Sequence, residues 1–317
     1  MRLAMISSRN TASDYRLDSI HTPVLVKEVL GNLVPKKGGV YLDATLGLGG
    51  HTKALLQAYP DIERVIALDW DEEALELAKM RLEPFESKIS FYQSNFSNLE
   101  VVLSEEGVTQ VDGIIMDLGL SSFQLDESGR GFSFMRDEPL DMRMDRSTTI
   151  LASDMINKLP EDRLVQLIQL YGEEPWAKKI AAAIVAKRQD RPIFSTLELA
   201  TIVKEAIPKR FHPRKIHPAT RTFQAIRIAI NREFENLTCA LEASYRVLSP
   251  GGRICVISFH SLEDRIVKHF FRGCKELEVV TKRPVRPSRD EITSNPRSRS
   301  AKLRVAQRVM QVTEVGK

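Results

Sequence analysis

Glycines and two aspartates in the first half of the chain have the spacing of a nucleoside site. Residues 43–51, Asp-Ala-Thr-Leu-Gly-Leu-Gly-Gly-His, follow an apolar run, and their glycines let the backbone approach a ligand. Asp69 follows Gly49 by 20 residues and ends a second apolar run. A carboxylate there can accept hydrogen bonds from two ribose hydroxyls. Asp117 ends a later apolar run. Together these residues predict a nucleoside-binding site.

The spacing of these glycines also indicates which class of nucleoside the site fits. A dinucleotide fingerprint requires a third glycine where Thr52 stands, and no Gly-Lys-Ser/Thr follows to hold a triphosphate. A nucleoside without a pyrophosphate, such as S-adenosylmethionine, fits this pattern better. The alternative is that the glycines only turn the chain, because isolated glycine motifs are weak signals.

An alternation of strands and helices must position these residues. The pattern predicts strands over 40–44, 64–69, 89–92 and 113–118, with helices over 51–58 and 71–82. Alternation of this kind is typical of a parallel sheet, whose ligands bind at the carboxyl ends of the strands. The first, second and fourth strands should therefore bring Gly49, Asp69 and Asp117 to one edge.

A long interval then interrupts the sheet before the next expected strand, 254–259. A structureless loop of that length is abnormal, so the interval must carry its own structure. Apolar spacing predicts helices over 161–170, 176–187 and 197–206. We expect a small helical domain inserted over 137–214, between sheet-domain parts 21–136 and 215–317, with a flexible N-terminus over 1–20. A long helix over 222–247 and a last strand over 303–312, which could close the sheet edge, complete the expectation.

Composition indicates an ordinary globular protein of a reducing compartment. The 317 residues carry a net charge of +4, and the three cysteines form no disulfide framework. No secretory signal fits the N-terminus, and no apolar stretch reaches the roughly 18 residues of a membrane span. We therefore expect a cytoplasmic location and no membrane partner. The histidines at 21, 212, 217 and 269 form no metal-ligand set, so no metal is expected.

Several longer stretches resemble the bacterial RsmH family, also called MraW, the 16S rRNA cytosine-N4 methyltransferases. One characteristic stretch of the resemblance is Asp-Leu-Gly-Leu-Ser-Ser at 117–122. The resemblance as a whole extends from His21 to about Arg308, and the first twenty residues lie outside it. Its stretches are 21–25, 43–51, 117–125, 130–136, 140–145, 171–174, 217–227 and 258–265.

This resemblance implies a fold, a cofactor and a substrate. The fold is an α/β, Rossmann-like class I S-adenosylmethionine-dependent methyltransferase domain, interrupted by a small all-helical domain. The substrate is a cytidine in the decoding centre of 16S rRNA, in the small ribosomal subunit. The implied cofactor-binding residues are Gly49, Gly50, His51, Asp69, Phe96, Asp117 and Gln124.

Transfer to an exocyclic amine requires alignment and a proton acceptor near a poor nucleophile. Asp117 is the candidate for this catalytic role. Amino-methyltransferases that act on DNA often carry Asp/Asn/Ser-Pro-Pro-aromatic here, but residues 117–120 are Asp-Leu-Gly-Leu. Methylation of the cytosine ring carbon needs a thiolate, and no cysteine stands in a suitable motif. Cys255, inside an expected strand, is most simply a small buried hydrophobe.

Two basic clusters predict contact with RNA. Residues 204–232 hold eight Lys or Arg against Glu205, and residues 282–308 hold nine against Asp290 and Glu291. Such runs are also typical of a solvated face. His260 either contacts the target base or lies beside a helix N-cap at Ser261. The candidate RNA-binding residues are His260, Arg214, Lys215, Arg221 and Arg227.

Other functions stay open at this point. The acceptor could be another RNA base or DNA, or the chain could be a ribosome-assembly factor that has lost turnover. The oligomeric state, monomer or dimer, does not follow from the sequence.

Overall fold

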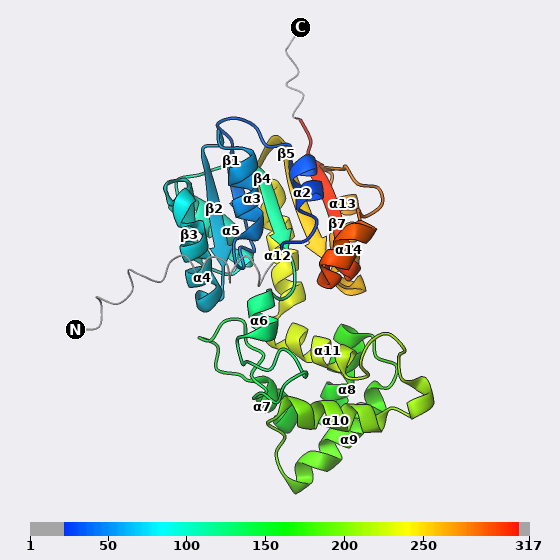
Figure 1. Cartoon of the computed structure of the whole chain (residues 1–317). Coiled ribbons are helices and arrows are strands. Elements are labelled where there is room, and N and C mark those ends of the chain that lie inside the picture. The colour runs from blue at the N-terminus through cyan, green and yellow to red at the C-terminus, as the bar shows by residue number, and fades with distance from the viewer. Residues whose placement is uncertain (1–21, 311–317) are drawn as a thin grey trace, which may run out of the picture. The chain divides into compact units, whose positions relative to one another are not determined.

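Seven strands form one mixed sheet in the computed structural model, which describes residues 22–310. The strand order is β3-β2-β1-β4-β5-β7-β6 (Figure 1). The parallel strands are β1 (Val40–Asp43), β2 (Arg64–Asp69), β3 (Ile89–Gln93), β4 (Val111–Asp117) and β5 (Leu248–Ser258). β7 (Lys302–Arg308) runs antiparallel to both β5 and β6 (Leu277–Val279). The predicted Rossmann-like α/β fold is confirmed.

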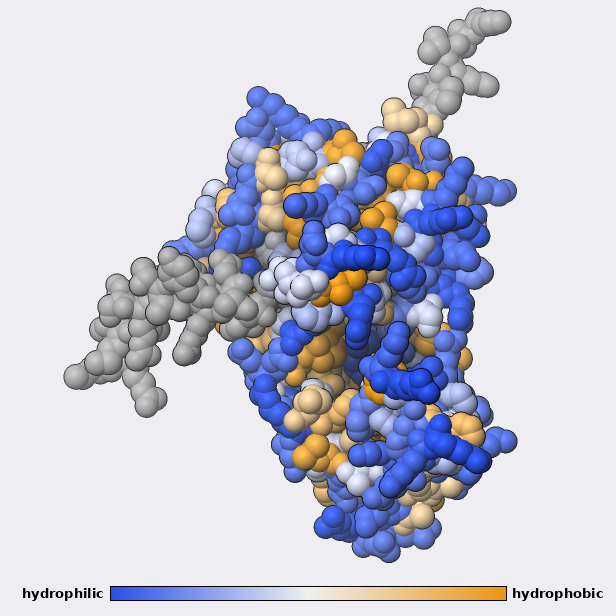
Figure 2. All heavy atoms as spheres, turned by 45° about the vertical axis from the view of Figure 1, so that its right-hand side comes forward, coloured by the Kyte–Doolittle hydropathy of each residue, from blue (hydrophilic) through white to orange (hydrophobic). Residues whose placement is uncertain are grey.

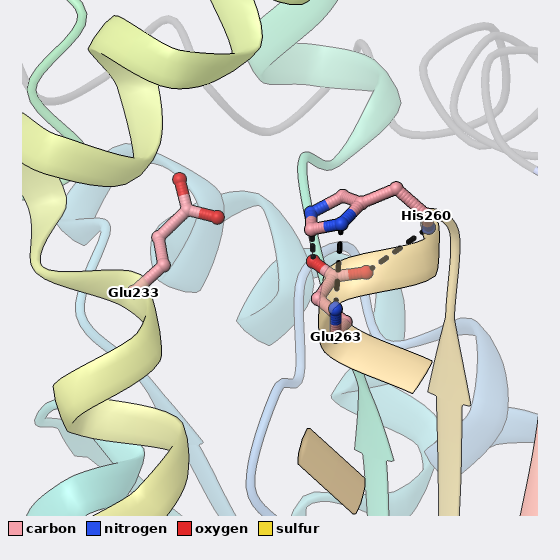
Figure 3. Close-up of side chains that lie close together, drawn as sticks. All are labelled: Glu233, His260 and Glu263. Carbon is pink, nitrogen blue, oxygen red and sulfur yellow. Dashed lines mark hydrogen bonds and ion pairs between the residues drawn. The ribbon is translucent and has the colours of Figure 1, made fainter. Parts of the chain in front are cut away.

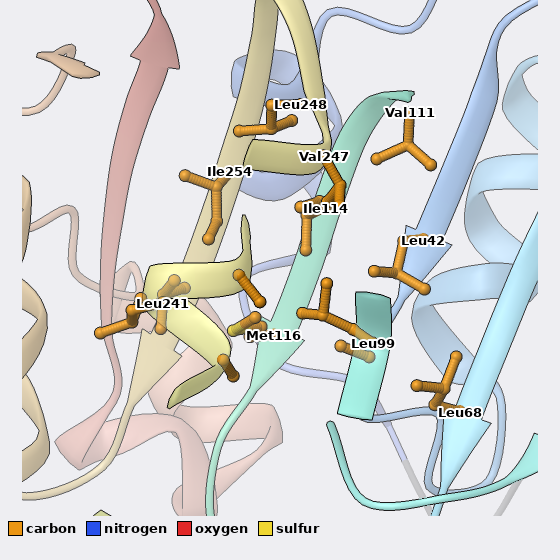
Figure 4. Packing of buried hydrophobic residues seen from close by; sticks show 14 of the residues in the cluster. Leu42, Leu68, Leu99, Val111, Ile114, Met116, Leu241, Val247, Leu248 and Ile254 are labelled. Carbon is orange, nitrogen blue, oxygen red and sulfur yellow. The ribbon is translucent and has the colours of Figure 1, made fainter. Parts of the chain in front are cut away.

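Helices cover both faces of this sheet because strand side chains alternate between the faces. The helices are α2 (Val26–Leu33), α3 (Gly50–Ala58), α4 (Glu72–Leu82), α5 (Leu99–Glu105), α12 (Glu233–Val247), α13 (Ser261–Gly273) and α14 (Arg289–Ser294). The 3₁₀ turns are η1 (Glu83–Lys88), η2 (Phe96–Asn98) and η4 (Pro296–Ser300). Ile114 faces a core cluster with α5, α12 and α13 (Figure 4), whereas its neighbour Ile115 faces a cluster with α2, α3 and α4.

The chain divides into two compact units. Unit 1 holds the sheet and is built from residues up to Gly119 and from Glu235 onward, and unit 2 is Leu120–Phe234. Unit 2 is helical, with α6 (Ser122–Asp126), α7 (Ala152–Lys158), α8 (Glu161–Gly172), α9 (Ala177–Asp190), α10 (Thr196–Ala206), η3 (Lys209–Phe211) and α11 (Thr220–Asn231). The three helices predicted in this region are confirmed, and the stretch 137–214 lies wholly inside unit 2.

The single long helix expected over 222–247 is wrong. α11 ends at Asn231, Arg232 adopts a left-handed φ of 50°, and α12 starts at the next residue. Buried Asn231 explains the break, because its side chain donates to the Met142 carbonyl and accepts from the Met144 amide, both at 2.8 Å. These tertiary contacts outweigh a helical pattern that continues across the break.

The expected last strand needs a second correction. β7 ends at Arg308, and residues 311–312 of the predicted strand, like the N-terminal stretch 1–20 and His21, lie outside the described residues. β7 does not close the sheet edge, because β6 pairs with its other side. At three residues, β6 is too short to give an alternation in the sequence.

Hydrophilic residues dominate the face drawn in Figure 2. Within residues 22–310, no helix has the length and apolar character needed to cross a bilayer.

Candidate functional site

The turn after β1 is bonded to the ends of two neighbouring strands. The Ala44 amide donates to the Ile115 carbonyl of β4 at 2.9 Å, and the Leu46 amide donates to the Leu68 carbonyl of β2 at 2.8 Å. The Gly47 amide then donates to Oδ2 of Asp69 at 2.7 Å. The carboxyl ends of β1, β2 and β4 therefore meet at one turn, as the spacing of their residues predicted.

Two glycines in this turn have a steric role. Gly47 and Gly49 adopt left-handed φ angles of 52° and 75°. A side chain at Gly49 would place Cβ 2.6 Å from Leu82, and one at Gly50 would lie 2.9 Å from Pro23. Glycine thus lets the backbone turn directly into α3. The positive end of the α3 dipole lies at this turn and favours a negatively charged ligand group.

Thr52, which stands where a dinucleotide fingerprint would have its third glycine, holds the Asp43 side chain at the end of β1. Its carboxylate is 2% exposed, accepts from the Thr52 hydroxyl at 2.7 Å and lies 3.3 Å from the Thr45 amide. Burial raises the pKa of Asp43, and the Thr52 and Thr45 bonds and His51 only partly oppose this. Neither Asp43 nor Thr52 was predicted as a site residue, although Asp43 begins the glycine motif 43–51 and Thr52 follows it directly.

His51 and Asp117 form a buried pair between α3 and β4. His51 Nε2 lies 3.5 Å from Asp117 Oδ2, with the side chains 6% and 17% exposed. Burial lowers the pKa of His51, but Asp117 and Asp43 together outweigh it, so the pKa of His51 is raised above 6.5. Within residues 22–310, neither Nδ1 of His51 nor Oδ1 of Asp117 has a hydrogen-bond partner. Two buried polar atoms at this turn are thus available to a ligand.

Asp69 is held by the backbone at the end of β2. Besides the Gly47 amide on Oδ2, it accepts from the Asp71 amide on Oδ1 at 2.9 Å. Burial nevertheless raises the pKa of Asp69 to about 7. Each carboxylate oxygen has a second lone pair, so Asp69 can still accept hydrogen bonds from a ligand.

Phe96 lies on a segment that is bonded to the end of β2. The Ser94 amide donates to the Asp69 carbonyl at 2.9 Å, and two residues later Phe96 begins η2. The Phe96 side chain is half-buried and packs against the core cluster that contains Ile114. An aromatic ring is therefore anchored close in sequence to the backbone of Asp69.

Gln124, the remaining predicted cofactor residue, lies in unit 2. It forms a capping box at the start of α6, where its Oε1 accepts from the Ser121 amide at 3.0 Å and its own amide donates to Ser121 Oγ at 3.2 Å. The side chain is buried and its orientation is fixed by this cap.

His260 caps α13 (Figure 3). Its Nδ1 accepts from the Glu263 amide at 3.4 Å, and its Nε2 lies 3.0 Å from Glu263 Oε1. Glu263 Oε2 in turn accepts from the amides of Phe259 and His260. The expected N-cap at Ser261 is therefore wrong by one residue, because the imidazole ring takes the capping position.

The predicted RNA-binding cations differ in their partners. Arg227 makes a two-pronged ion pair with Glu233 at 2.7 and 2.8 Å, and Arg221 donates to the Glu173 carbonyl at 3.3 Å. Arg214 and Lys215 are exposed and have no ion pair within residues 22–310. The latter two are the more available to an anionic partner.

Sequence comparisons place the chain among known proteins. A profile described as the MraW methylase family matches residues 18–309. The Ribosomal RNA small subunit methyltransferase H of Desulfotalea psychrophila is 48% identical over 292 residues, covering 92% of this chain and 99% of its own length. Proteins of the same name from Geobacter sp. (strain M21) and Cyanothece sp. (strain PCC 7425) are 49% and 48% identical, covering 92% and 94% of this chain and 99% and 97% of their own lengths. The chain belongs to the MraW methylase family.

Proposed function

We propose that this protein transfers a methyl group from S-adenosylmethionine to the N4 amine of a cytidine in the decoding centre of 16S rRNA. The observation that carries the proposal is the turn after β1, which is bonded to the ends of β2 and β4 and leaves Asp117 Oδ1 and His51 Nδ1 without partners among the described residues. Membership of a methylase family supports the reaction type. The names of the relatives support a small-subunit rRNA substrate.

The donor fits the groups at this turn. S-adenosylmethionine supplies an electrophilic methyl group on its sulfonium. The backbone at Gly49 and Gly50 holds the methionine end at the start of α3, where the helix dipole favours its carboxylate. Asp69 accepts from the ribose hydroxyls, and Phe96 stacks on the adenine. Gln124, which the family resemblance implies, completes the set of residues proposed to bind the donor.

Asp117 acts on the amine that receives the methyl group. The cytosine amine is a poor nucleophile because its lone pair is delocalised into the ring. A carboxylate oxygen that accepts a hydrogen bond from this amine makes it more nucleophilic and can take up the released proton. Oδ1 of Asp117 is free for this task, while Oδ2 faces His51. His51 is the positioning residue, because its Nε2 lies 3.5 Å from Asp117 Oδ2 and fixes the orientation of the carboxylate.

The cysteines support nitrogen rather than ring carbon as the acceptor. Cys255 lies inside β5, paired with Ile115 and Val305, and burial raises its pKa to about 12. Cys274 ends α13, where burial also raises its pKa. Cys239 lies in α12 and is exposed. None of these positions is a strand end at the turn after β1, where a thiolate nucleophile would be needed.

Methylation of purified small ribosomal subunits tests the proposal. Subunits from a strain that lacks the corresponding gene are incubated with the protein and S-adenosylmethionine, and their nucleosides are analysed by mass spectrometry. We expect one new N4-methylcytidine, located in the decoding centre. A methyl group on another base, or preferential methylation of duplex DNA, would identify a different acceptor. Absence of S-adenosylmethionine binding by calorimetry, together with no methyl transfer, would indicate an assembly factor.

A further inference from the structure

In unit 2, two aromatic rings contact each other, and a cationic side chain lies close to each ring. The rings of Trp176 and Phe211 have centroids 5.0 Å apart at an interplanar angle of 42°. Lys179 Nζ lies 5.0 Å from the Trp176 ring, and the Arg210 guanidinium lies 4.8 Å from the Phe211 ring. We call these four residues the aromatic platform. They lie outside the set of residues proposed to hold the donor.

Backbone contacts hold the two rings in place. Trp176 immediately precedes α9, and its amide donates to the buried Glu174 carboxylate at 2.9 Å. Phe211 ends η3, where its amide donates to the Pro208 carbonyl at 2.8 Å. His212 Nε2 lies 2.9 Å from the Ile207 carbonyl, which ties the end of η3 to the end of α10. The rings are thus presented by a fixed backbone.

The platform is exposed rather than part of a core. Phe211 is 49% exposed, Lys179 and Arg210 are exposed as well, and Trp176 is half-buried. A ring that served only packing would be covered by apolar neighbours, because burial is what makes an aromatic side chain stabilising. Here each ring instead has a cation close to it. Aromatic faces accompanied by cations are the groups that proteins use to stack unpaired bases.

The cations around the platform are available to phosphates. Within residues 22–310, an exposed set has no carboxylate partner: Lys178, Lys179, Lys204, Lys209, Arg210, Arg214 and Lys215. Some basic residues elsewhere in unit 2 are paired, for example Arg143 with Asp141, Lys158 with Asp154 and Arg191 with Glu198. Arg136 and Arg163 are exposed and, within residues 22–310, have no carboxylate partner. Most of the exposed cations of unit 2 that lack a carboxylate partner among the described residues therefore lie in α9 or within residues 204–215. Their charge is complementary to a nucleic-acid backbone.

We infer that the aromatic platform binds a single-stranded segment of RNA by stacking an unpaired base. The base takes a ring face that a cation covers in the free protein, and the cation then pairs with a flanking phosphate. This inference rests on the proposed function, because it makes the platform a second contact with the rRNA substrate. A base stacked here is distinct from the cytidine at Asp117.

Fluorescence of Trp176 reports stacking directly, without methyl transfer. The chain has two tryptophans, so a Trp70→Phe background leaves Trp176 as the single tryptophan, whose emission is excited selectively at wavelengths that tyrosine does not absorb. Titration with oligouridylate of about ten nucleotides should quench this emission. An abasic oligonucleotide of equal length keeps the phosphates but lacks the bases, and it should bind weakly with little quenching. Polyglutamate tests whether the platform instead recognises an acidic protein.

Substitutions in the same background separate stacking from folding. Phe211→Leu keeps an apolar side chain without a π-face and should weaken oligouridylate binding about tenfold or more, whereas Phe211→Tyr should bind like the parent. Arg210→Ala should also weaken binding. Phe194→Ala removes an exposed ring outside the platform, and Arg163→Ala removes an exposed cation that contacts no ring among the described residues. Neither control should change the affinity, and circular dichroism verifies that each variant is folded.

The outcomes separate this inference from the proposed function. Equal quenching by abasic and uridine chains, equal affinities of Phe211→Leu and Phe211→Tyr, or tighter binding of polyglutamate would each overturn the platform. Methylation of small subunits is measured in parallel. If the parent methylates subunits while Phe211→Leu binds oligouridylate normally, the platform is wrong and the function stands. If no methylation occurs while uridine quenching is normal, the function fails and the platform stands.

Discussion

Burial controls the acidic groups at the turn after β1. Asp43 and Asp69 both have raised pKa values because burial penalises their charged forms more than their hydrogen bonds compensate. The sequence predicted Asp69 and Asp117 correctly as strand-end carboxylates, because each closes an apolar run. The contacts of Asp43 with Thr52 and of His51 with Asp117 could not be predicted from the sequence. The second contact requires β1 to lie beside β4, and chain spacing does not reveal that pairing.

Asp69→Asn should change stability in a pH-dependent way. The folded-state pKa of Asp69, about 7, is raised from 3.8, so the folded protein binds the extra proton between these values. The stability of the wild type relative to Asp69→Asn should therefore fall as pH rises from 4 to 7 and change little above that. The fall should be on the order of 2 kcal/mol, because the carboxylate is partly exposed. Urea unfolding of both proteins across this range measures it.

Asp69→Ala should weaken binding of the methyl donor and leave binding of the RNA unchanged. Loss of hydrogen bonds to a charged acceptor costs about 1.5–3 kcal/mol, or roughly 10- to 100-fold in affinity for S-adenosylmethionine. Calorimetry with the donor measures this loss. Arg221→Ala is the matched comparison and should leave donor binding unchanged while weakening binding to small subunits. Equal losses of donor affinity in both variants would contradict the division of roles.

His51 should stabilise the fold most when it is protonated. Its folded-state pKa is raised above 6.5, so its stabilising contribution is complete below pH 6.5 and is lost as pH rises through the folded-state value. The stability advantage of wild type over His51→Gln should therefore be larger at pH 6 than at pH 9. Denaturant unfolding at the two pH values measures the difference. An equal advantage at both pH values would contradict the raised pKa of His51.

Local pattern predicted most elements, and tertiary contacts account for the exceptions. β2 begins and ends at the residues that its apolar run predicted, and α8 and α10 follow their helical spacing closely. The break between α11 and α12 was missed because Asn231 is engaged by Met142 and Met144, residues far away in the sequence. A short strand such as β6 exists only because β7 offers it a partner.

Gly172→Ala should push two helices of unit 2 apart. A Cβ there would lie 2.7 Å from the Arg221 carbonyl oxygen and 3.3 Å from Ala225 Cβ, both on α11. We expect a loss of about 1–3 kcal/mol in unfolding free energy. Gly31→Ala is the matched control, because a Cβ at Gly31 in α2 meets nothing within 4 Å. That control should stabilise the protein by about 0.5–1 kcal/mol, as alanine favours a helix interior.

At the scale of the whole molecule, the interrupted strand pattern was the informative signal. The absence of a convincing strand after β4 predicted a separate helical region, and unit 2 occupies Leu120–Phe234. The sequence predicted the basic cluster over residues 204–232 but not the aromatic platform. Trp176 precedes α9 and Phe211 ends η3, so their contact depends on how α9, α10 and η3 pack.

Salt dependence should reveal the phosphate contacts of unit 2. The logarithm of RNA affinity should fall linearly with the logarithm of salt concentration. The double variant Arg214→Ala, Lys215→Ala should reduce the slope by about 0.7–0.9 for each phosphate that the protein no longer neutralises. Lys158→Ala removes a cation that is already paired with Asp154, so its slope should match the wild type. Filter binding at several salt concentrations provides the slopes.

The position of β7 in the sheet has a consequence for biosynthesis. A nascent chain emerges from its N-terminus, so unit 2 is fully synthesised while the sheet still lacks three of its strands. β5 then keeps an unpaired edge until Lys302–Arg308 leaves the exit tunnel and aligns antiparallel with it. Translation that stops before Lys302 would release a chain with this edge uncovered. Such a product would be prone to aggregation and a target for chaperones and proteases.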